Sequence, residues 1–124
     1  MPARVQGFSK IESITGRASF FGFTKVVSLT FESQDDLFPL SSSISLVLQT
    51  AKPRGNFRVQ LRFTGVINFE LRQFGGYTQI LGFDVLDVSD RQWDGIKFEV
   101  IDNEDQKFHF LCETAEVEYV ENIE

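Results

Sequence analysis

Residues 57 to 71 alternate almost without interruption between apolar and polar side chains. The odd positions are apolar or glycine: Phe57, Val59, Leu61, Phe63, Gly65, Ile67, Phe69 and Leu71. The even positions are polar, with Val66 as the exception. Because successive side chains of a β-strand point to opposite faces, this period of two predicts a strand with one face on a core and one in water. The pattern indicates a fold class but names no chemistry.

The same stretch is too long for one straight strand. At ~3.3 Å per residue it would span about 50 Å, whereas a domain of this length has a radius of gyration of roughly 14 Å. Gly65 adds no side chain to the apolar row, and Val66 is the one apolar residue on the polar face. We therefore predict two strands, or one coiled strand, turning at Gly65 and Val66.

Other segments repeat the strand pattern at short intervals, separated by turn residues. The apolar sets are Phe21, Phe23, Val27, Leu29 and Phe31; Ile44, Leu46 and Leu48; a run from Ile80 to Val88; Phe98 and Val100; Phe108, Phe110 and Cys112; and Ala115, Val117 and Tyr119. The last set has the opposite parity to the one before it, which predicts a bulge near Glu113 and Thr114. A capping box at Ser9 to Glu12 and a glycine at Gly16 predict one short helix over about residues 10 to 15.

Together these patterns predict a mainly β fold. We expect an antiparallel β-sandwich or a strongly curved sheet of seven to eight strands with one short N-terminal helix, forming a single all-β domain over residues 1–124. The chain has 14 phenylalanines against 2 tyrosines and 1 tryptophan, and since phenylalanine has no polar group, most of these rings should lie in the core. An exposed Phe-rich surface is the alternative.

The single cysteine, Cys112, excludes an intramolecular disulfide and favours a reducing compartment. The first ten residues lack the apolar stretch of a signal peptide, and no segment approaches the ~18 apolar residues of a membrane span. We expect a cytoplasmic protein without a membrane partner.

The net charge of −6 is unevenly distributed. Residues 1 to 62 carry 8 Lys and Arg against 4 Asp and Glu, a balance of +4, while residues 63 to 124 carry 4 against 14, a balance of −10. Nucleic acid is a poor candidate partner for the acidic half, because phosphate binding needs clustered basic residues. A basic protein is a better one, and a solvated acidic surface that only maintains solubility is the alternative.

Few residues in the chain are suited to catalysis or metal binding. His109 is the only histidine and should point away from Cys112, which disfavours a Cys-His dyad. Pairing of the two flanking strands should place Glu99 opposite His109 as a surface contact. One His and one Cys are too few for a zinc site, and the acidic clusters lack an EF-hand pattern, so we expect no metal and no cofactor. No phosphate-binding glycine loop occurs.

Trp93 lies in an acidic connection, between Asp90 and Asp94. A loop tryptophan either caps the end of a sandwich or anchors a partner. Both interpretations stay open from the residues alone.

Several segments resemble small all-β immunity proteins from bacterial polymorphic-toxin systems. The similar segments are Val59 to Val66, Phe69 to Leu71, Ile80 to Phe83 and Phe108 to Cys112, about half of the chain, together with Ser19 to Gly22, which resembles an N-terminal Ser-Phe-His-Asp motif. Phe21 and Gly22 replace the His-Asp pair, so no role of that pair is carried over.

The resemblance implies a non-catalytic protein that neutralises a toxin by covering its active site or its substrate-binding surface. An acidic surface suits a basic toxin, because complementary charge speeds association. On this basis we expect the partner to contact the loops at 87 to 95 and 102 to 106, with Trp93 as the apolar anchor. The candidate residues are Asp87, Asp90, Trp93, Asp94, Asp102, Glu104 and Asp105.

Two other function classes remain open. One is a small-ligand or carbohydrate-binding β module, which predicts exposed aromatic side chains on a concave face. The other is a homo-oligomeric structural protein, for example a homodimer that pairs through an edge strand such as residues 117 to 120. An enzyme is the least supported class.

Overall fold

The computed structural model describes residues 5–15, 23–33, 42–50, 57–72, 83–91, 95–102 and 107–123. These residues form two four-stranded antiparallel sheets and one short helix. The first sheet has the order β1-β2-β3-β8 and consists of Phe23–Glu32, Ser43–Thr50, Phe57–Thr64 and Thr114–Asn122. The second has the order β4-β7-β6-β5 and consists of Ile67–Leu71, Phe108–Cys112, Phe98–Asp102 and Phe83–Asp87. The predicted fold class is therefore confirmed.

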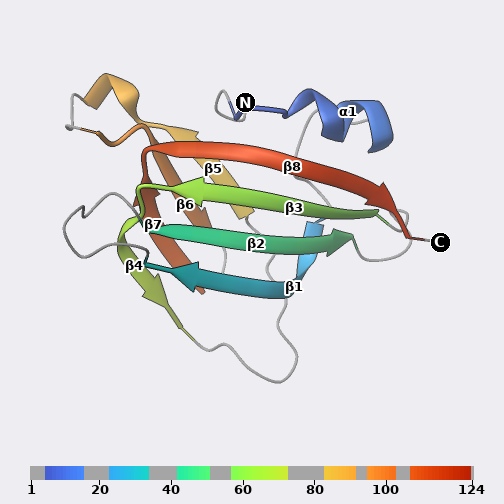
Figure 1. Ribbon diagram of the computed structural model, residues 1–124, viewed down its shortest axis with the longest axis horizontal. Helices are drawn as coiled ribbons and strands as arrows, with labels where there is room; N and C mark the ends of the chain where they lie inside the picture. The colour runs from blue at the N-terminus through green and yellow to red at the C-terminus, as the bar shows by residue number, and fades with distance from the viewer. Residues whose placement is uncertain are drawn as a thin grey trace.

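The strands of the two sheets run in different directions. In Figure 1 the first sheet runs across the view, and the strands of the second sheet run steeply behind it. Side chains from both sheets share one hydrophobic core. In sandwiches whose strands cross at a large angle, the corners are made by strands that bend from one sheet into the other. Two such corners occur here.

The core follows the alternation seen in the sequence. The fully buried residues include Ile44, Leu46 and Leu48 from β2, Val59, Leu61 and Phe63 from β3, and Val100, Phe108 and Phe110 from the second sheet. The rings of Phe63 and Phe110 meet edge to face, with their centroids 5.1 Å apart. Phe31 differs from these rings, since it is 46% exposed and stacks on Phe69 with a centroid distance of 5.6 Å. Phe31 lies on β1 and Phe69 on β4, each an edge strand of its sheet.

The predicted break at Gly65 is the first corner. β3 ends at Thr64 and β4 begins at Ile67, and the two strands belong to different sheets. Gly65 has a φ of 67°, a left-handed conformation that side chains other than glycine rarely adopt. Val66 was expected on the polar face, but it is only 4% exposed, because the turn at Gly65 resets which positions face inward.

The second corner lies at Glu113, between β7 and β8. The sequence predicted a bulge here from the change of parity, but the chain instead passes from the second sheet back to the first. The two corners are bonded to each other, because the Glu113 N–H donates to the Thr64 carbonyl at 2.9 Å and the hydroxyls of Thr64 and Thr114 share a hydrogen bond. The irregularity within β8 lies further on, where the register with β3 shifts between Gln60 and Leu61.

The parity predicted for β1 holds only in part. Phe23 is buried as expected, but the pairing of β1 with β2 shifts register between Phe23 and Lys25 and again between Val26 and Ser28. As a result Val26 packs against the core while Val27 is 43% exposed.

The helix α1 spans Ser9–Thr15, one residue earlier than predicted, and its Ile11 is fully buried. The predicted glycine end at Gly16 and the segment around Phe21 lie outside the described residues. Before the helix, Gln6 forms an isolated parallel bridge with Glu116 of β8. Figure 1 shows α1 beside β8, along the edge of the first sheet.

Candidate functional site

The first candidate surface is an acidic turn that follows β5. The strand ends at Asp87, and a single 3-10 turn, η2, spans Ser89–Arg91. The Asp87 Oδ1 accepts hydrogen bonds from the Ser89 N–H at 2.9 Å and from the Ser89 hydroxyl at 2.6 Å. Such local bonds from an aspartate to the backbone two residues later fix a tight turn. Asp87 and Asp90 are both exposed on it.

A second, smaller hydrophobic cluster supports this turn. Val88, Ile96 and Leu111 are buried together, with Ile67 and Leu86 packed against them. Leu111 points to the face of β7 opposite Phe110, so the cluster lies on the outer side of the second sheet. The backbone adds a further link, since the Val88 N–H donates to the Lys97 carbonyl at 2.8 Å. The acidic turn is therefore held against the sheet.

Polar and charged side chains connect the same turn to two strands. Arg91 Nη1 lies 3.8 Å from Glu99 Oε1, and Glu99 Oε2 lies 2.7 Å from His109 Nε2. The expected surface contact between Glu99 and His109 is thus confirmed, but its register was wrong: Glu99 pairs directly with Leu111, and His109 with Ile101. The two side chains meet diagonally across β6 and β7.

The structure gives Cys112 no catalytic role. It is fully buried and lies in the main core, while His109 is on the opposite face of β7. Burial raises the pKa of the Cys112 thiol to about 12. Because the thiolate is the nucleophilic form, this cysteine is unreactive near neutral pH.

The buried thiol predicts a specific dependence of stability on pH. Below pH 9.0, the usual pKa of the group, the thiol is protonated in both states and its contribution is constant; between pH 9.0 and about 12 it ionises only in the unfolded chain. The free energy of unfolding should therefore fall as pH rises, by about 1.4 kcal/mol at pH 10 from this group alone. Urea denaturation from pH 7.5 to 10 measures it, with Cys112→Ala as the control that lacks this part of the slope. Parallel curves for the two proteins would contradict the assignment.

The structure describes three of the seven expected partner-binding residues. Asp87 and Asp90 lie together on the acidic turn. Asp102 is 0% exposed, and its Oδ2 accepts a hydrogen bond from the Lys107 N–H at 3.2 Å. Its side chain thus stabilises the end of β6 and does not reach the surface. Trp93, Asp94, Glu104 and Asp105 lie outside the described residues.

Part of the positive charge of the first half is balanced inside the first sheet. Arg58 Nη2 donates to Gln49 Oε1 at 3.2 Å, and its Nη1 lies 3.9 Å from Glu121 Oε1 on β8. Arg62 pairs in register with Glu116 of the same strand. The two halves of the chain therefore meet at the junction of β3 and β8.

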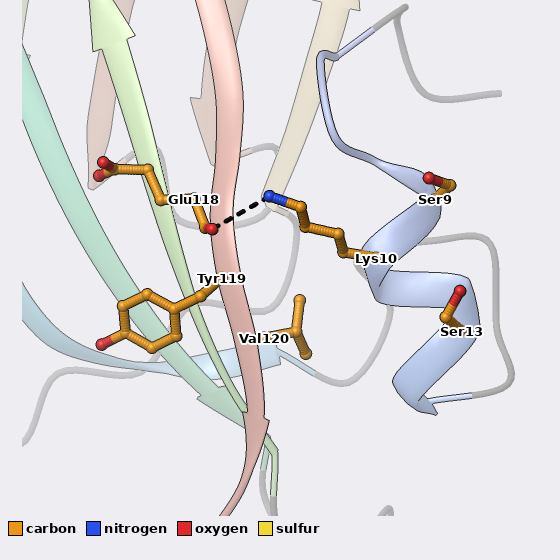
Figure 2. Close-up of a pocket in the computed structure, with 6 residues that line it drawn as sticks. All are labelled: Ser9, Lys10, Ser13, Glu118, Tyr119 and Val120. Carbon is orange, nitrogen blue, oxygen red and sulfur yellow. Dashed lines mark hydrogen bonds between the residues drawn. The ribbon is translucent and has the colours of Figure 1, made fainter.

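The second candidate surface is a groove between α1 and β8. It encloses about 330 Å³ and is lined by Ser9, Lys10, Ser13, Glu118, Tyr119 and Val120. Figure 2 shows Val120 directed toward the helix, while the side chains of Glu118 and Tyr119 point away from it. No sequence pattern predicted this groove, because its two walls are more than 100 residues apart in the chain.

Within the described ranges, no group of three or more His, Cys, Asp or Glu side chains is placed to hold a metal ion. The same residues include no helix with the length and hydrophobicity needed to cross a membrane.

Comparison with known proteins identifies one family. The model of the family described as Immunity protein PIM8 matches residues 7–118, which include α1, the acidic turn, the second sheet and the first sheet as far as Glu118 in β8. No curated protein and no solved structure matches the chain.

Proposed function

The chain belongs to the PIM8 immunity protein family, and from that premise we propose that it neutralises a basic protein toxin by covering it with the acidic turn after β5. Family membership supports binding of a toxin in general. The identity of the binding surface and the charge of the toxin are our proposal.

The observation that carries this proposal is that the acidic turn is held in place by contacts of its own. Asp87 fixes the backbone at Ser89, the cluster of Val88, Ile96 and Leu111 supports it, and Arg91 ties it to Glu99. A surface that is already ordered loses less conformational entropy when a partner binds. Exposed carboxylates on such a surface attract a basic partner and raise the rate of association.

We place Asp87, Asp90, Asp94, Glu104 and Asp105 in the contact, with Trp93 as its apolar anchor. Tryptophan is favoured at the centre of protein interfaces, where a ring of polar residues excludes water around it. Asp102 is left out, because its side chain is buried. β5 and β6 are antiparallel neighbours, so the two loops begin at opposite ends of this pair, where Asp87 lies opposite Phe98 and Asp102 opposite Phe83. The proposed partner therefore spans the length of the β5-β6 pair.

A charge reversal at Asp90 tests this proposal. Asp90→Lys should weaken binding of the cognate toxin domain by tenfold or more and should reduce the salt dependence of the association rate, because an attractive charge becomes repulsive. Surface plasmon resonance at two salt concentrations measures both quantities. Asp90 is chosen over Asp87 because Asp87 holds the turn together.

The matched control is Glu32→Lys, an equal change of charge at an exposed residue at the end of β1, in the other sheet. It should leave affinity within about twofold, since exposed charges separated by more than a Debye length interact weakly. Equal effects of the two substitutions would show that only net charge matters and would overturn the acidic turn as the binding surface.

A further inference from the structure

β8 forms one edge of the first sheet, and the N-terminal part of the chain covers some of this edge. Edge strands carry backbone N–H and C=O groups that point away from the sheet and can pair with another chain. Along β8 these groups meet, in order, a short N-terminal segment, a lysine side chain and then the groove beside α1.

The N-terminal segment shows that this edge accepts a parallel strand. The Gln6 N–H donates to the Ala115 carbonyl at 3.0 Å, and the Val117 N–H donates to the Gln6 carbonyl at 2.7 Å. The pairing stops at Gly7, whose φ of 76° turns the chain away from β8. A Cβ at this position would lie 2.7 Å from the Val117 carbonyl oxygen, so the turn requires glycine.

Beyond Gly7, where the backbone turns away from β8, the side chain of Lys10 bonds to the edge of this strand. Its Nζ donates to the carbonyls of Val117 at 3.3 Å and Glu118 at 3.2 Å, and Figure 2 shows the second of these bonds. An ammonium group thus occupies a place beside the edge that a backbone N–H would take in an added strand. Lysine at an edge is one of the common means of limiting strand pairing.

Beyond Lys10 the groove follows β8 along residues 118–120. The helix contributes Ser9 and Ser13, and the strand contributes its backbone and the Val120 side chain. Two hydroxyls, a strand edge and one small apolar side chain suit an extended peptide, in which main-chain hydrogen bonds provide affinity and alternate side chains provide specificity.

The charge around the groove selects the kind of peptide. Residues 113 to 124 contain five glutamates and no lysine or arginine. Of the three on β8, Glu116 pairs in register with Arg62 and Glu121 lies near Arg58, whereas Glu118, which lines the groove, accepts a hydrogen bond from the neutral Gln60 Nε2 at 2.9 Å. Glu118 is therefore the negative charge that a basic side chain of an added strand would meet. Cross-strand neighbours of opposite charge stabilise a sheet, whereas like charges oppose pairing.

We propose that the groove between α1 and β8 binds an extended segment of a partner protein as an added strand, with basic side chains at alternate positions and small apolar ones between them. The added strand continues the line that Gln6 begins. This is a second interaction surface, separate from the acidic turn, and it does not depend on the function proposed for that turn.

The test uses a synthetic peptide as the probe. The acetylated and amidated pentapeptide Lys-Val-Lys-Val-Lys should bind, as measured by isothermal titration calorimetry, and should shift the backbone amide resonances of residues 118–120. Glu-Val-Glu-Val-Glu should bind at least tenfold more weakly because of its charge. A Lys-Val-Lys-Val-Lys peptide with N-methyl groups at alternate residues should also lose at least tenfold, because its backbone cannot pair. Equal binding of the methylated peptide, or no binding of the parent peptide at millimolar concentration, would overturn the proposal.

A matched pair of variants locates the site. Ser13→Trp fills the groove and should weaken peptide binding at least tenfold, whereas Ser28→Trp, on the exposed face of β1, should leave it unchanged. Unchanged peptide binding in Ser13→Trp would contradict the proposal. It would also be contradicted if the wild-type protein sedimented as a dimer that Ser13→Trp dissociates, because a second copy of the chain would then occupy the groove. Asp90→Lys should not alter peptide binding, so failure here is distinguishable from failure of the acidic turn in toxin binding.

Discussion

Replacing Phe110 by alanine is expected to lower the free energy of unfolding by about 3 to 5 kcal/mol, because it leaves a cavity where both sheets meet. The ring is fully buried, and its centroid lies 5.1 Å from that of Phe63, 6.0 Å from that of Phe69 and 6.4 Å from that of Phe108. Contacts between aromatic rings add to the burial of their surface. Urea denaturation measures the change, which should appear in the midpoint with little change in slope.

Phe31→Ala is the matched control for this substitution. It removes the same side chain from a ring that is 46% exposed and stacks on Phe69. We expect a loss of about 1 kcal/mol, since little apolar surface leaves the core and the space opens to solvent. A loss at Phe110 no larger than that at Phe31 would contradict the core described here.

Gly65→Ala is expected to destabilise the protein by about 2 to 4 kcal/mol, which combines backbone strain with a steric clash. Gly65 has a φ of 67°, and a Cβ added there would lie 2.8 Å from the Cβ of Glu113. Neither corner can easily move, because the Gly65 N–H donates to the Ser42 carbonyl at 2.9 Å and the Glu113 N–H donates to the Thr64 carbonyl at 2.9 Å.

A double-mutant cycle separates the two causes. Glu113→Gly removes the Cβ that would clash, so Gly65→Ala should cost less in the Glu113→Gly background than in the wild type, by about 1 kcal/mol or more. The remaining cost measures the strain of a left-handed residue. Strictly additive effects would show that the two corners do not touch in solution.

The sequence predicts this fold well where strand alternation alone determines which side chains are buried. Ile44, Leu46 and Leu48 alternate without a break, and the structure buries all three. The corner at Gly65 was predicted because a straight strand would exceed the size of the domain. The corner at Glu113 produces the same change of parity as a bulge, so the sequence alone could not distinguish them. Sheet membership is a long-range property that local alternation does not report.

Register and bulges were the harder features. The Glu99 and His109 contact was found, but the pairing was misplaced by two residues, because shifting a strand pair by two keeps every side chain on its own face. In β1 the two register shifts depend on pairing with β2, which no pattern within β1 reveals. The exposure of Val27 follows from them.

The candidate site was predicted as a set of acidic residues, and the structure distinguishes their environments. Asp90 is exposed on η2, whereas Asp102 is buried and bonded to the Lys107 backbone. Both are aspartates near the end of a strand, and the sequence offers no signal that separates them. Arg91 was not considered as part of the site, although it is the cation that links the turn to Glu99. Arg91 directly follows Asp90 in the sequence, and this adjacency to a predicted site residue was the signal that could have included it.

The placement of β8 also constrains how the protein folds during synthesis. β8 pairs with residues of β3 that lie 50 to 65 positions earlier, and its first half pairs with Gln6, so the first sheet is incomplete until residues 114 to 122 have been made. Pairings so distant in sequence slow folding, since loop closure must precede their stabilising contacts. Until then α1 lacks the strand beside it, and the outer edge of β3 is open. A nascent chain thus exposes an aggregation-prone strand that the last segment of the fold must cover.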